Sequence, residues 1–294
     1  MATKYWTGGA GDSNFATGGN WSDGSSPTTG DVCVLASDPD GNTNFINAGD
    51  HTSLGALKLI VGPNWSGTIG IQSTPLTLNL TELEYSGQGS IAHFETSGGT
   101  TSKVTVTDTG SGNLPFRLRG SNTISEFVMT DAKATVLIDG AGGRNVSTIN
   151  MIGARRTAVL DLTQDGTGEV SCTTVKVNGG VLKMNHTCTS VEVSGAGQLD
   201  VTGTATIGTL DIYNGVVDWK TEGTTSSINA LNVYSGQFMA DQCTATVSTI
   251  AATQLYETAT INEQNGVEGI VWSGGITVNG GTLQLDPGRV VTVS

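Results

Sequence analysis

Charged residues are scarce in this chain, and basic residues are the scarcest. Only 13% of the 294 residues are Asp, Glu, Lys or Arg, and 26 acids outnumber 13 Lys and Arg, so the net charge is −13. Because phosphate recognition depends on Lys and Arg, this balance excludes nucleic-acid binding through the overall field. The surface must be covered by Ser, Thr, Asn and Gly, a composition that suits short strands and many turns.

Other scarcities narrow the class further. The four cysteines, Cys33, Cys172, Cys188 and Cys243, form no CxxC pair, so no zinc site is expected. No apolar run approaches the roughly 18 residues of a membrane span. The first residues, MATKYWTGGAGDSN, lack the basic start and apolar core of a signal peptide, so we expect a protein made in the cytoplasm.

What the chain does contain is a recurring six-residue figure: apolar, any, small or acidic, apolar, any, apolar. Its copies are Leu54–Leu57–Leu59, Leu80–Leu83–Tyr85, Ile124–Phe127–Met129, Val146–Ile149–Met151, Cys172–Val175–Val177, Cys188–Val191–Val193, Ile207–Leu210–Ile212, Ile228–Leu231–Val233 and Val247–Ile250–Ala252, with weaker copies at Val104–Val106 and Ile276–Val278. They start 16 to 26 residues apart. A fixed figure at such an interval is the mark of a solenoid.

A glycine follows the figure in several copies. These corner glycines are Gly180, Gly215, Gly236 and Gly281, and the apolar residues two positions later are Leu182, Val217, Phe238 and Leu283. Glycine tolerates positive φ at a tight corner, so each repeat reads as strand, corner, strand and variable loop. A hairpin meander also alternates, but it need not repeat one slot per turn. We therefore predict an all-β, right-handed parallel β-helix of about eleven rungs, in which Cys172 and Cys188 stack and face inward.

The first 34 residues lack the figure and are expected to form an N-terminal cap or docking segment, with the solenoid over 35–294. Their motifs are Trp6-Thr7-Gly8-Gly9-Ala10-Gly11, Asn20-Trp21-Ser22, and Pro27 followed by Gly30-Asp31-Val32. They resemble the W-x-G-G-x-G, N-W-S and P-x-x-G-D-x-V pattern that opens many bacterial and phage β-solenoid proteins, including autotransporter-like adhesins and virion surface proteins. The resemblance implies a folding cap in which Trp6 and Trp21 plug the first rung.

One segment carries five of the six arginines and a net positive charge. The basic residues of 117–156 are Arg117, Arg119, Lys133, Arg144, Arg155 and Arg156, and its acids are Glu126, Asp131 and Asp139. This excess can be a solvated face. It can also be a docking stripe for an acidic partner such as a neighbouring copy. We therefore take Trp6, Trp21 and the five arginines as candidate partner-binding residues.

A search for catalytic chemistry gives weak candidates only. His51, His93 and His186 lie in no nucleophile motif, and the repeat points Cys188 inward, where thiols are inert. Carboxylates on adjacent rungs could flank a glycosidic bond: Asp200 with Asp211 or Asp218, or Asp161 with Asp165 and Glu169. We interpret them as acids that keep strand surfaces soluble, because no slot repeats an acid beside an aromatic platform.

Residues 38–44, DPDGNTN, alternate oxygen-bearing side chains like the start of a calcium loop. The spacing of Gly41 and Gly49 does not fit that loop, so an Asx/Gly turn is the better interpretation. We expect no metal and no cofactor.

We therefore expect a non-enzymatic structural protein of a phage virion: a capsid decoration, cement or head-spike protein, forming a homotrimer and contacting the major capsid protein or other virion proteins. The alternatives are a tailspike-like polysaccharide depolymerase and a bacterial β-helix adhesin, either of which would contact a host glycan. Loops at 38–50, 86–101 and 253–275 are the expected variable contact surfaces.

Overall fold

A computed structural model describes residues 1–37, 45–46, 49–88, 91–107, 116–130, 135–139, 143–153, 157–163, 170–221, 226–241, 243, 248–263 and 270–285. The chain forms two compact units, Met1–Ser147 with Gln164–Val170, and Thr148–Thr163 with Ser171–Ser294. The described residues contain strands and two short 3-10 helices, η1 (Gly18–Asn20) and η2 (Thr52–Leu54), and no α-helix.

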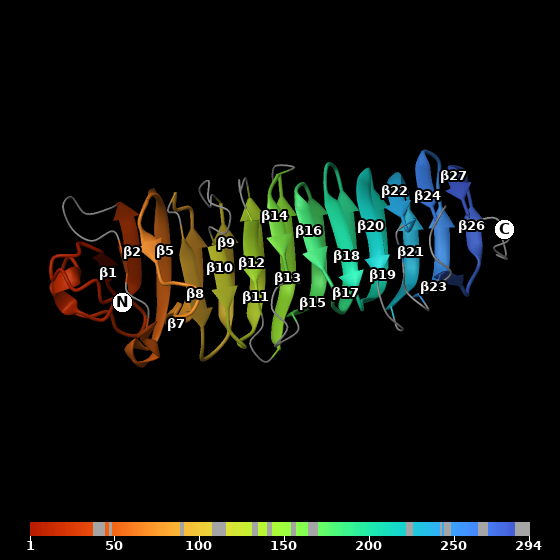
Figure 1. The fold of residues 1–294 in the computed structure, drawn as a ribbon. Coiled ribbons are helices and arrows are strands. Elements are labelled where there is room, and N and C mark those ends of the chain that lie inside the picture. The colour runs from red at the N-terminus through yellow and green to blue at the C-terminus, as the bar shows by residue number, and fades with distance from the viewer. Residues whose placement is uncertain are drawn as a thin grey trace. The chain divides into compact units, whose positions relative to one another are not determined.

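The first unit is built from two parallel ladders (Figure 1). Its strands are β1 (Thr3–Tyr5), β2 (Val32–Ser37), β3 (Phe45–Ile46), β4 (Gly49–Asp50), β5 (Ala56–Asn64), β6 (Thr68–Ile69), β7 (Leu76–Tyr85), β8 (Ala92–Thr96), β9 (Thr101–Val106), β10 (Phe116–Arg119), β11 (Ile124–Thr130) and β12 (Thr135–Ile138). One ladder runs β1, β2, β5, β7, β9, β11, and the other runs β3, β6, β8, β10, β12. Strand β13 (Arg144–Ile152) begins in this unit.

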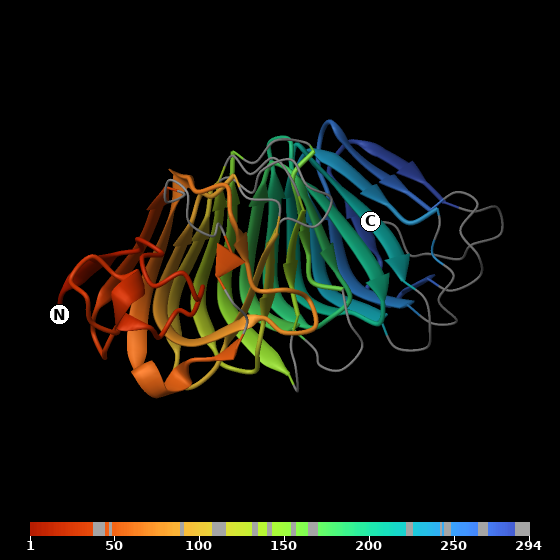
Figure 2. The ribbon, with the colours of Figure 1, turned by 60° about the vertical axis from the view of Figure 1, so that its left-hand side comes forward.

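The second unit repeats the arrangement more regularly, and its strands follow one another in chain order (Figure 2). They are β14 (Val159–Asp161), β15 (Val170–Asn178), β16 (Val181–Met184), β17 (Cys188–Ser194), β18 (Gln198–Gly203), β19 (Thr206–Tyr213), β20 (Gly215–Thr221), β21 (Ser226–Val233), β22 (Gly236–Met239), β23 (Ser248–Leu255), β24 (Ala259–Asn262), β25 (Ile270–Trp272), β26 (Ile276–Val278) and β27 (Thr282–Gln284). Odd-numbered strands from β15 to β23 form one ladder, which continues into β25 and β26. Even-numbered strands from β14 to β24 form the other, which continues into β27.

The predicted parallel β-solenoid is thus confirmed. The structure has about 9 turns, slightly fewer than the predicted eleven rungs. The six-residue repeat does not mark every strand of the ladders: β1 and β2 belong to the ladder but carry no copy of the repeat. Cys172 and Cys188 are register partners and both are buried, as expected. Ile207, Ile228 and Ile250 continue their column.

In two strands, the residues that face inward are not all those that the six-residue repeat predicts. In β23, Thr253 and Leu255 occupy the inward slots opposite Leu231 and Val233, whereas Ala252 is exposed. The neighbouring strand sets the register, so a buried threonine takes an apolar slot.

In β5 the inward residues are Leu57, Leu59 and Val61, and Leu54 belongs to η2. A bulge between Leu57 and Lys58 shifts the pairing with β7. The extra residue, Thr81, lies in β7, where Leu80, Leu83 and Tyr85 keep the predicted spacing, whereas β5 lacks it and its inward residues alternate strictly.

The glycine corners form a column across the rungs of the second unit. Gly215 pairs with Gly236, and a Cβ on Gly236 would lie 2.3 Å from the carbonyl oxygen of Gly215. Gly180, Gly236 and Gly281 adopt positive φ as predicted, but beside Gly215 it is Asn214 that does so, at φ 62°. Glycine is therefore required here because one rung's backbone lies directly on the next.

Candidate functional site: an exposed tyrosine ladder

The aromatic residues of the cap are buried together. Trp6 and Trp21 pack edge to face with ring centroids 5.3 Å apart, and Phe15 lies 4.9 Å from Trp21. The Trp21 Nε1 donates a 2.8 Å hydrogen bond to the Phe15 carbonyl oxygen. Trp6 and Trp21 are therefore core residues of the cap, 5% and 2% exposed.

The same segment covers the free edge of β1. Trp21 forms an antiparallel bridge with Trp6, and the Ser22 amide donates to the Tyr5 carbonyl at 2.9 Å. Buried Lys4 pairs with Asp23, and its hydrogen bond is the main reason that the pKa of Asp23 is held at about 2. An unpaired edge would invite another strand, so this cover blocks end-on pairing at β1.

Asp31 holds the beginning of the chain against the solenoid. Its carboxylate accepts hydrogen bonds from the Ala2 amide at 2.7 Å and from the Thr28 amide at 3.0 Å. Burial alone would raise the pKa of Asp31, but these hydrogen bonds outweigh burial, so its pKa lies below the usual value. The aspartate of the sequence motif therefore has a structural role in the cap.

Two of the predicted docking arginines are buried. The Arg117 Nε donates to Asp139 Oδ2 at 2.8 Å, and both side chains are nearly inaccessible. Arg119 is 31% exposed, and its Nε lies 3.7 Å from the same carboxylate. Arg117 and Asp139 thus form a buried ion pair in the first unit.

Arg144 is 1% exposed and holds together a group of buried polar side chains. Its guanidinium donates to the Thr96 hydroxyl at 2.7 Å, the Asn122 Oδ1 at 3.2 Å and the Arg119 carbonyl at 2.5 Å. Burial lowers its pKa to about 10. Asn122 donates in turn to Thr101 at 2.9 Å.

The predicted basic stripe is therefore not a row of exposed cations among the described residues, where Arg119 alone of the candidates is partly exposed. Arg155 and Arg156 lie outside the described residues, as do Lys133 and Asp131. A count of charges along the sequence does not show that Asp139 neutralises Arg117, or that Thr96 and Asn122 accept the hydrogen bonds of Arg144, because these partners lie on other rungs.

The four cysteines are free and buried. Burial raises the pKa of the Cys188 thiol to about 11 and that of Cys33 to about 12. Burial also lowers the pKa of His51 and His93. A thiol so disfavoured as a thiolate is a packing residue.

The candidate carboxylates are only partly brought together. Asp200 and Asp218 are register partners in β18 and β20, whereas Asp211 lies in β19 of the other ladder. Asp218 pairs with Lys220 at 2.5 Å, and Asp200 accepts from Gln198 at 2.7 Å.

Of the second predicted group, Asp161 is buried and accepts from the Thr163 hydroxyl at 2.6 Å. Asp165 and Glu169 lie outside the described residues, as does the 38–44 loop. Among described residues, no three His, Cys, Asp or Glu are close enough to hold a metal ion.

A row of three stacked tyrosines stands at the ends of β19, β21 and β23. The ring centroids of Tyr213 and Tyr234 are 4.5 Å apart with a 3° interplanar angle, and those of Tyr234 and Tyr256 are 4.8 Å apart with 15°. Tyr213 is 39% exposed and the other two are partly exposed. We call these residues the tyrosine ladder.

Sequence reasoning missed the tyrosine ladder, although a signal was present. Each tyrosine directly follows the last apolar position of its repeat, after Ile212, Val233 or Leu255. The slot two positions before each tyrosine holds Asp211, Asn232 and Gln254. An aromatic slot beside a polar slot therefore recurs, although Asp211 is the one acid among these three residues and no acid repeats beside the aromatic slot.

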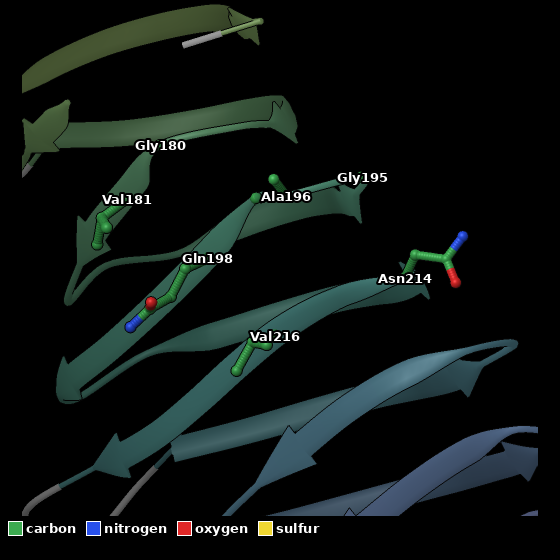
Figure 3. A pocket seen from close by; sticks show the side chains of 8 residues that line it. Gly180, Val181, Gly195, Ala196, Gln198, Asn214 and Val216 are labelled. Atoms are coloured by element: carbon green, nitrogen blue, oxygen red, sulfur yellow. The ribbon is translucent and has the colours of Figure 1, made fainter. Parts of the chain in front are cut away.

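A hollow of about 180 Å³ adjoins this region (Figure 3). It is lined by Gly180, Val181, Gly195, Ala196, Gly197, Gln198, Asn214 and Val216. Figure 3 shows Val181, Gln198 and Val216 one after another on neighbouring strands, with Asn214 at the turn. Three of the lining residues, Gly180, Gly195 and Gly197, carry no side chains, which leaves the hollow open. We call it the corner hollow.

No family model, no curated protein and no solved structure matches this chain. No helix among the described residues is long and apolar enough to cross a membrane.

Proposed function

We propose that the chain is a non-enzymatic structural protein on the surface of a phage virion, a capsid decoration or head-spike protein that assembles as a homotrimer on the major capsid protein. The observation that carries the proposal is the cap. The residues that resemble the opening of phage β-solenoid proteins build one buried unit around Trp6, Phe15 and Trp21. The residues that carry the resemblance thus form a buried cap, which is what the resemblance implies and what supports the proposal.

The cap also favours side-by-side assembly over end-to-end growth. The Trp21–Ser22 segment occupies the edge of β1, so another chain cannot add a strand there. Copies joined side by side through other faces form a closed trimer when a three-fold rotation relates them. With Arg117 and Arg144 buried, half-exposed Tyr5 on the cap is the better anchor for the capsid.

Immunogold labelling of purified virions tests the proposal, with antibody raised against the recombinant chain. Label over the head, together with the chain in the peptide map of density-gradient virions, is the expected result. Recovery of the chain only with cell envelopes or in the soluble fraction would reject the virion assignment.

Assembly is tested separately by light scattering on the purified chain. A homotrimer has three times the chain mass of 30.1 kDa. A Tyr5→Asp chain should keep that mass but lose binding to undecorated heads. Unchanged head binding would remove the cap from the docking surface.

A further inference from the structure

The tyrosine ladder leaves one ring face uncovered by another aromatic residue. At the position of Tyr213, the preceding rung holds Ser194. Ser194 has a small side chain and accepts a 3.2 Å hydrogen bond from the Asn178 amide. On the other side, Tyr234 covers Tyr213. The 39% exposure of Tyr213 fits a flat apolar face open to solvent at the end of the ladder.

Neutral and acidic hydrogen-bonding groups line the slot beside the ladder. Asp211 and Asn232 are register partners joined by a 2.8 Å hydrogen bond from the Asn232 amide. Glu192 occupies the same slot one rung earlier, and Gln254 one rung later. Amides supply donors and acceptors and carboxylates supply acceptors, which is what adjacent hydroxyl groups of a sugar require.

The corner hollow provides room next to Tyr213. Asn214 follows Tyr213 in sequence and lines the hollow together with Gly195 and Gly197. Because those glycines carry no side chains, a ligand lying on Tyr213 can extend over the corner without displacing protein atoms. Gln198 adds an amide at its far side.

The charges of the site exclude anionic ligands. Burial raises the pKa of Tyr213 most. Its hydrogen bond with Tyr234 and the negative charges of Asp211 and Glu192 raise the pKa further. A chain of net charge −13 with these acids in the slot repels phosphates and acidic sugars. Pyranose rings of neutral sugars have one apolar face and a rim of hydroxyl groups, matching a ring face flanked by amides and carboxylates.

From these observations we propose that the open face of Tyr213, with the Asp211–Asn232 slot and the corner hollow, binds a neutral glycan. The sugar ring lies on Tyr213, and its hydroxyl groups bond to the neighbouring amides and carboxylates. The site does not depend on where the chain is assembled, so it can hold even if the virion assignment fails.

The test measures binding of the purified full chain to a microarray of neutral and acidic oligosaccharides and, in native gels, to dextran, laminarin, xyloglucan and galactomannan. We expect binding to at least one neutral glycan and no preference for acidic ones. Tyr213→Ala should weaken that binding at least about tenfold, since it removes the stacking face. Tyr213→Trp, which keeps an aromatic face, should retain it.

Ile71→Ala is the matched control, because Ile71 is 42% exposed, close to the exposure of Tyr213, but lies outside the ladder. This variant should bind glycans like the unmodified chain. Circular dichroism and light scattering on each variant report folding and oligomeric state. The proposal is overturned by the absence of neutral-glycan binding, by equal binding of Tyr213→Ala, or by a Tyr213→Ala chain that changes oligomeric state instead, which would make the ladder a contact between copies.

Discussion

The outward columns of the two units differ in chemistry. In the first unit, Lys58, Glu82, Lys103 and Glu126 follow one another in register, with ion pairs of 2.7 Å between Lys58 and Glu82 and 3.0 Å between Lys103 and Glu126. Their charges satisfy one another. In the second unit, Tyr213 is 39% exposed, and the hydrogen bond between Asn232 and Asp211 uses one of the two amide donors of Asn232 and one acceptor site of Asp211. A column can bind a ligand only where its members do not use up each other's interactions.

The interiors differ in the same sense. The first unit buries Arg117 and Arg144 with Asp139, whereas the charged side chains buried in the described part of the second unit are the acids Asp161 and Glu263. The second unit also has the apolar column of Cys172, Cys188 and isoleucines. Buried arginines are therefore a feature of the first unit, and each needs its particular partners.

The largest expected effect breaks the buried ion pair. Asp139→Ala leaves the Arg117 guanidinium buried without its carboxylate, and should lower the free energy of unfolding by about 3–5 kcal/mol. Urea denaturation followed by circular dichroism measures the loss. Glu126→Ala removes the carboxylate of a largely exposed pair in the same unit and should cost less than about 1 kcal/mol. Equal losses for the two variants would contradict the contrast between interior and surface.

Backbone stacking in the second unit is tested at the glycine column. Gly236→Ala places a Cβ 2.3 Å from the Gly215 carbonyl oxygen at φ 90°, and should cost about 2–3 kcal/mol. Gly203→Ala is the control, because Gly203 also has positive φ but its nearest neighbour would be 3.4 Å away. It should cost about 1 kcal/mol from backbone strain alone. A Gly236→Ala chain as stable as the control would mean that the rungs are not in contact there.

A pH dependence should arise from the interior of the first unit. Burial, with Arg117 and Arg119 nearby, lowers the pKa of His93 below its usual 6.5. The native state therefore favours neutral His93, and its contribution to stability is complete above pH 6.5 and is lost as the pH falls toward the lowered pKa. Denaturation at pH 7 and pH 5 should show a smaller loss for His93→Gln than for the unmodified chain. An equal loss for His93→Gln and the unmodified chain would contradict this assignment.

The smallest expected effect concerns the stacked thiols. Cys188→Val continues an aliphatic column between Cys172 and Ile207 and should change stability by less than about 1.5 kcal/mol. Differential scanning calorimetry measures it. A larger loss would show that the thiol does more than fill space.

The sequence was informative wherever a slot repeats. Cys172, Cys188 and Ile207 share a spacing, and that spacing alone predicted their column. The repeat predicts the wrong inward residues where a bulge shifts the pairing of two strands, as at Leu57–Lys58. It also gives no signal for Arg117 and Arg144, because their partners lie on neighbouring rungs and share no common spacing. The tyrosine ladder was readable in principle, since Tyr213, Tyr234 and Tyr256 hold one slot, but an outward aromatic leaves no trace in an apolar pattern.

The central claim is that parallel rungs lie in register and so align outward side chains in columns. Paired cysteines at Asp211 and Asn232 test it most directly, because the two residues are register partners on neighbouring strands and the native thiols are buried. Adjacent strands bring Cα atoms within disulfide range, whereas strands two rungs apart do not. Peptide mapping after mild oxidation should show a bond for the 211–232 pair and none for a 211–254 pair. A bond in the second pair, or none in the first, would contradict the in-register stack.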